Sequence, residues 1–261
     1  MLRLDQEESL DNAEKVVALN NRILGQHGID LSLSADILDF GCGEGRHTYE
    51  YLDAGYKNII GFDIQNYLAL RQKSDLGYFR FPESEDDYSL PFPDNSFDFV
   101  TSTQVFEHVQ DQQEAISEIA RVLKPGGVSL HNFPSRWRPV ECHIAVPFGG
   151  AIQSSWWMAL WARLGVRSEL QKGRDAPSVI ESNLHFCANN LNYPSTGAIE
   201  RHWRAQFESV IFAEKAFIDG SRPISRLSRL AYPLVAVVPP LALALYRAAH
   251  THVVLARKPK P

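Results

Sequence analysis

Apolar residues in the first half of the chain gather in short, dense runs, and the segments between these runs have helical spacing. The first run ends directly in a cluster of glycines. We expect buried strands at five such runs: residues 35–40, 58–62, 77–81, 97–102 and 128–133. We expect helices at three segments between them: residues 46–52, 65–72 and 114–123. Strands that alternate with helices predict an α/β fold, namely a doubly wound, mainly parallel sheet with helices on both faces.

The pattern changes at both ends of the chain. Residues 5–24 have the spacing of an amphipathic helix. Residues 135–207 hold all five tryptophans and predict helices and loops inserted before the last strands. Two closing strands are expected at residues 210–217 and 252–256, because strand-forming residues are dense there.

The chain has no Gly/Ser-rich or Pro-rich linker, and its 261 residues, 44% of them hydrophobic, can bury one sizeable core. We therefore expect a single domain, 1–261, with four parts. These parts are an N-terminal helical segment (1–29), a ligand-binding core (30–134), a helical insert or substrate lid (135–207), and closing strands (208–261) that include an apolar helical segment (222–249).

Charge and cysteine content narrow the function. The net charge is −5 and the first two thirds of the chain lack a basic run, which argues against nucleic acid as the main ligand. The three cysteines, Cys42, Cys142 and Cys187, do not have the spacing of metal ligands. No pair of His, Cys or carboxylate residues has that spacing either, so we expect no metal. Reduced thiols and a charged N-terminus predict a cytoplasmic protein that is not exported.

The glycine cluster is the first chemical signal. In doubly wound sheets a ligand lies outside the carboxyl ends of the strands, where the chain turns into a helix. Glycines at Gly41, Gly43 and Gly45 permit a sharp turn and a close approach of a ligand to the main chain. A dinucleotide fingerprint requires glycine at the sixth position of the motif, where Arg46 stands, and no P-loop Gly-Lys-Ser/Thr follows. An ordinary strand-to-helix turn is the alternative interpretation.

Asp63 is the second signal, because it closes the strand at residues 58–62 about 20 positions after the glycines. An acidic residue at this distance is placed to accept hydrogen bonds from two ribose hydroxyls. The alternative is a helix N-cap, a position that Asp often fills.

The sequence resembles the class I S-adenosylmethionine-dependent methyltransferases, especially the branch with the ubiquinone/menaquinone biosynthesis methyltransferases. Five motifs within residues 36–133 carry this resemblance: the glycine cluster with Asp39, then Asp63, Leu90–Asp98, Phe106–Val109 and Arg121–Gly127. The resemblance implies a Rossmann-like methyltransferase fold and S-adenosyl-L-methionine as the cofactor. It does not extend to the Trp-rich insert or to the C-terminal segment.

The resemblance also implies roles for individual residues. The main chain of Gly41-Cys42-Gly43-Glu44-Gly45 would lie against the methionine part of the cofactor, with Asp39 helping to hold its ammonium group. Asp63 would bind the ribose hydroxyls, and Ile64 would pack on the adenine. Four further positions are implied: Asp86 and Asp87 toward the adenine amino group, and Thr103 and Gln104 on the substrate side. Tyr88 and Ser89 disturb the usual pattern beside the two aspartates.

Methyl transfer needs a general base only when the acceptor must lose a proton. His108 follows the fourth expected strand, His131 lies late in the fifth, and His143 opens the insert. His108 and His131 are our candidate bases, and a structural role is the alternative for each of them. The Asn/Asp-Pro-Pro-Tyr segment of enzymes that methylate DNA bases is absent, which favours a small-molecule or lipid-like acceptor.

The C-terminal segment carries a further hint. Arginines at positions 222, 226 and 229 precede an apolar run that Pro239-Pro240 interrupts. A basic amphipathic helix that leads into apolar sequence fits peripheral contact with an anionic membrane through residues 222–249. A buried helical cover over the active site and a dimer contact are the alternatives, so the oligomeric state stays open.

An active methyltransferase is thus our first hypothesis. The second is a catalytically inactive methyltransferase-like protein that acts as a binding or interaction module. The intact glycines, Asp39 and Asp63 favour the first hypothesis. A nicotinamide-dependent oxidoreductase comes third, because Arg46 stands where that fingerprint has glycine.

Overall fold

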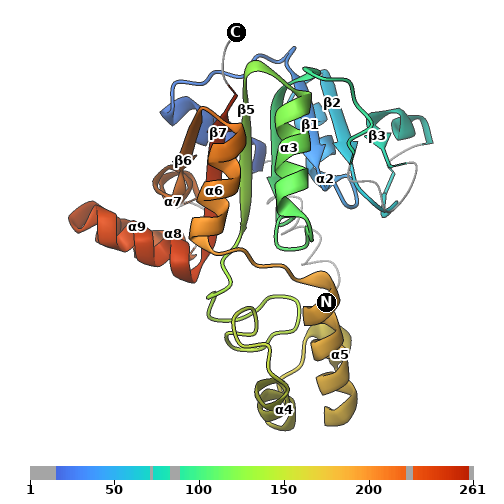
Figure 1. Cartoon of the computed structure of the whole chain (residues 1–261), viewed down its shortest axis with the longest axis vertical. Helices are drawn as coiled ribbons and strands as arrows, with labels where there is room; N and C mark the ends of the chain where they lie inside the picture. Colours follow the sequence, from blue (N-terminus) through green and yellow to red (C-terminus); the bar gives the residue numbers. More distant parts are fainter. Residues whose placement is uncertain (1–15, 71–72, 83–88, 222–225, 259–261) are drawn as a thin grey trace.

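A mixed sheet of seven strands crosses the part of the chain that the structure describes (Figure 1). The structure is a computed structural model, and it describes residues 16–70, 73–82, 89–221 and 226–258. The strand order is β3-β2-β1-β4-β5-β7-β6. Strand β7 pairs antiparallel with β5 and β6, whereas the other pairs are parallel. The predicted α/β fold with a mainly parallel sheet is therefore confirmed.

The strands have the following bounds: β1 Asp36–Phe40, β2 Asn58–Phe62, β3 Phe79–Arg80, β4 Phe97–Thr103, β5 Leu123–Pro134, β6 Ser209–Phe212 and β7 Thr251–Arg257. A first helix covers residues 16–26. The other helices are α2 Arg46–Asp53, α3 Gln112–Val122, α4 Ser155–Arg163, α5 Ala176–Asn190, α6 Thr196–Gln206, α7 Glu214–Ser221, α8 Arg226–Val237 and α9 Pro239–Ala249. Two short 3₁₀ segments complete the set: η1 Lys73–Tyr78 and η2 Glu169–Gln171.

The sheet is buried on both faces, which explains why its strands are almost continuously apolar. On one face, α3 and α6 contribute Ile116, Ile119 and Trp203 to a core that also holds Leu38 and Val100 from the strands. Both helices lie in front of the sheet in Figure 1.

The other face is covered by the helix at residues 16–26 together with α2 and α7. Ile23, Tyr51 and Ala216 pack there against Ile37 and Phe99. Residues 37 and 38 thus point to opposite faces, as the twofold alternation of a strand requires.

The insert between β5 and α6 has a small core of its own. Met158 of α4 and Cys187 of α5 pack with Ile144 and Val146. These two helices lie below the sheet in Figure 1, at the carboxyl end of β5. In contrast, α6 belongs to the main core through Trp203, although the predicted insert ran to residue 207.

Of the two predicted elements between β2 and β4, the helix is wrong and the strand is shorter than predicted. Residues 65–70 do not form the expected helix, since side chains there make local turns instead: Asp63 accepts a hydrogen bond from the main chain of Gln65 at 3.2 Å, and Asn66 accepts one from that of Leu68 at 3.3 Å. Such side-chain bonds compete with a helix. Residues 77–81 give only the two-residue strand β3, preceded by η1.

The predicted strand at residues 210–217 is correct in its first half and wrong in its second. Strand β6 ends at Phe212, and α7 begins at Glu214. The carboxylate of Glu214 is fully buried and accepts two hydrogen bonds from Arg247 of α9, at 2.9 and 2.8 Å. Local strand propensity cannot predict this contact, because the two residues are distant in the sequence.

The remaining predictions of elements are close to the observed bounds. The predicted strand at 58–62 coincides with β2, and residues 252–256 lie inside β7. Of the predicted helix at residues 5–24, the part before residue 16 lies outside the described residues. Among the described helices, none combines the length and the hydropathy that crossing a bilayer requires.

The packing of α6 leads to a stability prediction. Trp203 is 1% exposed and contacts Phe106, His131 and Phe207, whereas Trp156 of α4 is 62% exposed. We expect Trp203→Ala to lower the free energy of unfolding by about 3–5 kcal/mol. Trp156→Ala, the matched control, should change it by less than about 0.5 kcal/mol. Urea denaturation of the variants measures both values. Equal effects would show that α6 does not belong to the main core.

Candidate functional site

The chain turns sharply between β1 and α2. The main-chain N–H groups of Gly41 and Cys42 both donate to the carbonyl oxygen of Phe62, at 2.8 and 2.9 Å. The φ angles of Gly41, Gly43 and Gly45 are 75°, 53° and 83°, values that residues with a Cβ rarely adopt. The turn is thus fixed to the end of β2, the neighbouring strand.

The three glycines differ in their surroundings. A Cβ on Gly41 would lie 2.5 Å from a methyl carbon of Val105, and one on Gly45 would lie 2.7 Å from the ring of Phe79. A Cβ on Gly43 would meet nothing within 4 Å. The outer glycines are therefore required for packing, while the middle one faces open space that a ligand can enter.

The close helix packing that a dinucleotide fingerprint places at its sixth position occurs here at the fifth. Gly45 is buried against Phe79, and the side chain of Arg46 is exposed. Arg46 therefore does not obstruct the packing of α2. The glycine spacing itself still differs from the dinucleotide fingerprint.

Asp63 links the end of β2 to the glycine turn. One carboxylate oxygen accepts a hydrogen bond from the main chain of Gly43 at 2.8 Å, and the other accepts one from that of Gln65 at 3.2 Å. No helix begins at Asp63 among residues 63–70, so the alternative as a helix N-cap is wrong. The carboxylate is partly exposed and keeps lone pairs free for the hydroxyls of a ligand.

Asp39 lies beneath the turn and is 1% exposed. Its carboxylate accepts a hydrogen bond from the hydroxyl of Thr48 at 2.8 Å, and burial raises its pKa. Glu50, on the same helix as Thr48, is also buried, and neither of its carboxylate oxygens has a hydrogen-bond partner. Burial raises the pKa of Glu50 to about 8. Nothing in the local sequence around Glu50 marks it as a buried carboxylate.

The other predicted cofactor residues near the turn differ in how far their side chains are exposed. The side chain of Cys42 packs in a small cluster with Tyr49 and Phe79, and burial raises the pKa of its thiol. Only the main chain of Cys42 can therefore face a ligand. The side chain of Ile64 is 62% exposed. Asp86 and Asp87 lie outside the described residues.

Thr103 and Gln104 close β4, the strand on the other side of β1. Asn132 of β5 contacts both: its amide donates to Thr103 Oγ1 at 3.4 Å, and its main-chain oxygen accepts from Gln104 N at 2.8 Å. The strand order runs outward from β1 to β2 on one side and to β4 on the other. The glycine turn, Asp63 and Gln104 therefore surround a topological switch point, where α/β folds bind their ligands.

His131, one of our two candidate bases, is fully buried between Phe106 and Trp203. Its Nδ1 lies 2.7 Å from the hydroxyl of Ser102, and burial lowers its pKa to about 3. The structure thus places His131 in the core, where an acceptor molecule cannot reach it.

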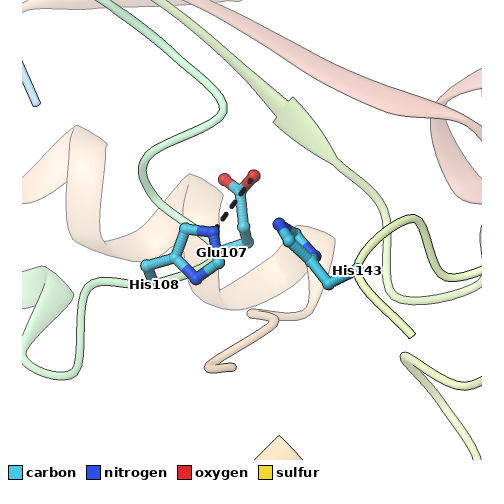
Figure 2. A group of neighbouring side chains, drawn as sticks. All are labelled: Glu107, His108 and His143. Carbon is cyan, nitrogen blue, oxygen red and sulfur yellow. Dashed lines mark ion pairs between the residues drawn. The ribbon is translucent and has the colours of Figure 1, made fainter. Parts of the chain in front are cut away.

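His108 is half-buried in the loop that follows β4, beside Glu107 and close to His143 (Figure 2). Its Nε2 lies 3.9 Å from Glu107 Oε1. Burial lowers the pKa of His108 and raises that of Glu107 to about 7. The pKa of His143, in contrast, rises to about 10: burial lowers it, but contacts with Cys142 and Glu141 outweigh that effect.

Hydrogen bonds join this loop to the insert. The main chain of Asn192 donates to the carbonyl oxygen of Glu107 at 2.6 Å, and its side-chain amide donates to the carbonyl oxygens of Val109 and Gln110 at 3.0 and 2.8 Å. Gln112 donates to the carbonyl oxygen of Asn192 at 2.9 Å. Asn192 was missed in the sequence, because its partners lie about 80 residues away.

Comparison with known proteins finds similarity to methyltransferases. Residues 38–130 match the family model described as "Methyltransferase domain". A probable S-adenosylmethionine-dependent methyltransferase of Mycolicibacterium smegmatis is 36% identical over 105 residues, which cover 39% of this chain and 38% of that protein. A sterol 24-C-methyltransferase of Gibberella zeae is 34% identical over 127 residues, 46% of this chain and 32% of that protein. The aligned part thus spans only about a third of the length of each relative.

A crystal structure of an S-adenosylmethionine dependent methyltransferase from Mesorhizobium loti has a similar fold. Its TM-score is 0.51 at 17% identity, and the match covers 95% of this chain and 100% of that one. Residues 38–130 thus match a methyltransferase domain, and the fold is similar to that of a class I methyltransferase. The ubiquinone/menaquinone branch within that class stays a prediction.

The buried His131 gives a pH prediction. Its pKa is about 3 in the folded protein, against 6.5 for an unperturbed histidine. Since only the unfolded chain can take up this proton, the contribution of His131 to stability is present above pH 6.5 and is lost as the pH falls toward 3. Between pH 7 and pH 5 this loss is about 2 kcal/mol.

We therefore expect His131→Gln to lose about 2 kcal/mol less stability than the wild type over this pH interval. Urea denaturation at the two pH values measures the difference, whatever the absolute stability of the variant. An identical pH dependence in both proteins would mean that His131 can be protonated in the folded state.

Proposed function

We propose that the protein transfers the methyl group of S-adenosyl-L-methionine to a small hydrophobic or lipid-like acceptor. The observation that carries this proposal is the hydrogen bond between Gly43 and Asp63. It joins the glycine turn to the end of β2 at the switch point of the sheet, and it leaves the carboxylate partly exposed beside open space. A protein that had only kept the fold would not need this arrangement.

The residues present fit the cofactor. The open side of Gly43 leaves room for a ligand against the main chain, and Asp63 can accept hydrogen bonds from ribose hydroxyls. The exposed Ile64 is available to pack on the adenine. Asp39 is too deeply buried to contact the cofactor over a large area. A negative charge on its carboxylate would still favour an ammonium group nearby.

When bound, S-adenosyl-L-methionine supplies a methyl group on a positively charged sulfur, activated for in-line displacement. The task of the protein is then to hold the acceptor atom close and aligned. Thr103 and Gln104 would line this side, and the loop after β4 would face the acceptor. His108 is the candidate base that remains, because Nε2 is free of the hydrogen bond made by Nδ1.

One feature supports a hydrophobic acceptor, and another argues against nucleic acid. The Gibberella zeae relative is a sterol methyltransferase by name. The net charge of −5 disfavours a nucleic-acid acceptor. We also keep the prediction of a cytoplasmic protein, which the free state of all three cysteines supports.

Calorimetric titration with S-adenosylhomocysteine tests the cofactor site. We expect saturable binding, and we expect Asp63→Ala to weaken it by roughly 10- to 100-fold, since hydrogen bonds to a carboxylate are lost. The matched control is Asp30→Ala: Asp30 is exposed ahead of β1, and its loss should leave the affinity unchanged. NAD, as a second ligand, should not bind.

Two results would contradict this proposal. A folded sample that binds no S-adenosylhomocysteine would favour the inactive binding module. Saturable binding of NAD that depends on Asp63 would favour the oxidoreductase.

We further propose that the α8–α9 hairpin docks on an anionic membrane surface. Five apolar side chains are at least 60% exposed on it: Leu230, Leu234, Val237, Leu241 and Leu245. The segment 226–249 has three arginines and no acidic residue. This exposure argues against the alternative of a buried cover within one molecule.

The opposite side of the hairpin is firmly attached. Val235 and Tyr246 pack on Ile218 of α7, and Arg247 pairs with the buried Glu214. An apolar ridge that carries the exposed Arg229 and is attached to the body of the protein is suited to shallow insertion between lipid headgroups.

Co-sedimentation with vesicles of phosphatidylcholine and phosphatidylserine tests the hairpin. We expect the double variant Leu234→Glu/Leu241→Glu to bind at least roughly 10-fold more weakly, because two apolar side chains no longer enter the lipid. Leu170→Glu is the control, since Leu170 is 93% exposed in η2. Unchanged vesicle binding would contradict the proposal. So would a dimer in sedimentation velocity that the double variant dissociates, because the hairpin would then bind a second copy.

A further inference from the structure

Glu107, His108 and His143 bring three metal-ligating atoms together in the loop after β4 and at the start of the insert. One ligand atom of each side chain lies within 4.8 Å of the others. Figure 2 shows the carboxylate of Glu107 facing ring nitrogens of both histidines. The two rings themselves lie edge to face, with centroids 4.8 Å apart.

The hydrogen bonds of the two histidines leave the same ring atom free. His108 Nδ1 lies 2.6 Å from the carbonyl oxygen of Asn190, and a carbonyl can only accept, so Nδ1 carries the proton. His143 Nδ1 lies 2.7 Å from a carboxylate oxygen of Glu141 and is a donor for the same reason. Nε2 is thus the nitrogen available on each ring. Metal-binding histidines typically have this outer hydrogen bond to a carbonyl or a carboxylate.

Glu107 is the unusual member of the group. Its side chain is fully buried, and neither carboxylate oxygen has a hydrogen-bond partner. A buried carboxylate without partners is costly for the folded protein. A cation between Glu107 and the two Nε2 atoms would satisfy it.

A second group of candidate ligands, Glu141, Cys142 and His143, is less suited to a metal. The carboxylate of Glu141 already accepts hydrogen bonds from the main chain of His143 and Ile144, at 2.8 and 2.9 Å, and from the hydroxyl of Tyr193 at 2.9 Å. Use of His143 Nδ1 as a ligand would also break its bond to Glu141. Glu141 therefore orients the ring of His143 rather than binding a metal.

We propose that Glu107, His108 and His143 form a binding site for a first-row divalent cation such as Zn²⁺. Two imidazoles and one carboxylate are a donor set that suits Zn²⁺ and leaves a coordination position open. Ligand atoms at the usual Zn²⁺ distances lie about 3.4 Å apart, so ligand atoms that are up to 4.8 Å apart must approach each other by up to about 1.4 Å. On binding, the cation would replace any proton on His143 Nε2.

The role of the cation rests on the proposed function. Val105, in the same loop, packs directly on Gly41 of the glycine turn, which places the site next to the switch point. A cation there would hold an acceptor through an oxygen atom, such as a hydroxyl, and would make its proton easier to remove. His108 would then be a metal ligand and not the base.

The test is a titration of tag-free full-length protein with Zn²⁺, in competition with a chromophoric chelator. We expect uptake of one equivalent, with loss of this binding in Glu107→Gln, His108→Gln and His143→Gln. Mg²⁺, which prefers oxygen ligands, should not displace Zn²⁺. Circular dichroism and titration with S-adenosylhomocysteine show whether each variant is folded.

Two control variants make the test specific. His185→Gln removes an exposed histidine of α5, and Cys142→Ser removes the exposed thiol of the competing group. Both should keep the full Zn²⁺ affinity. Loss of binding in Cys142→Ser would overturn the assignment to Glu107, and so would full binding in Glu107→Gln.

The two proposals can fail separately. Binding of S-adenosylhomocysteine without Zn²⁺ uptake would overturn the metal site and leave the methyltransferase intact. Zn²⁺ uptake that depends on the three residues, without binding of S-adenosylhomocysteine, would support the metal site and contradict the proposed function.

Discussion

Three hydrogen bonds hold the glycine turn against the end of β2, and the arrangement of the site depends on them. Phe62 accepts from Gly41 and Cys42, and Asp63 accepts from Gly43. They fix a turn whose glycines have positive φ angles, which β1 alone could not specify. They also orient the Asp63 carboxylate, which we propose binds the ribose hydroxyls. Because Val105 packs on Gly41, the loop after β4 takes its position from the same turn. The acceptor side is thereby set relative to the cofactor side.

The part of the site that the sequence predicts well is built from neighbours along the chain. The strands at residues 36–40 and 58–62, the glycine turn and Asp63 follow from local patterns and from the parallel pairing of two strands. The segment after Asp63 was predicted wrongly, because Asp63 and Asn66 make turns that a hydrophobic pattern does not reveal. Likewise, a buried ion pair between distant helices decides that α7 replaces the end of a predicted strand.

The acceptor side could not be predicted in this way. Glu107 and His143 are far apart in the sequence and meet because Asn192 and Asn190 attach the insert to the loop after β4. The absence of metal-ligand spacing in the sequence therefore said little about ligands brought together by the fold. A half-buried His108, a fully buried Glu107 and a His143 oriented by Glu141 form one polar group where the loop after β4 meets the insert. The two candidate bases, which looked alike in the sequence, differ in the structure. His131 lies in the core, whereas His108 belongs to this polar group.

We propose that the glycine turn and Asp63 bind the cofactor at the switch point between β1 and β4. A crystal structure of the full chain with S-adenosylhomocysteine tests this proposal most directly. We expect both ribose hydroxyls in hydrogen-bond contact with the Asp63 carboxylate, the adenine beside Ile64, and the sulfur on the side of Gln104. A ligand bound elsewhere, or one that leaves Asp63 without a contact, would contradict it.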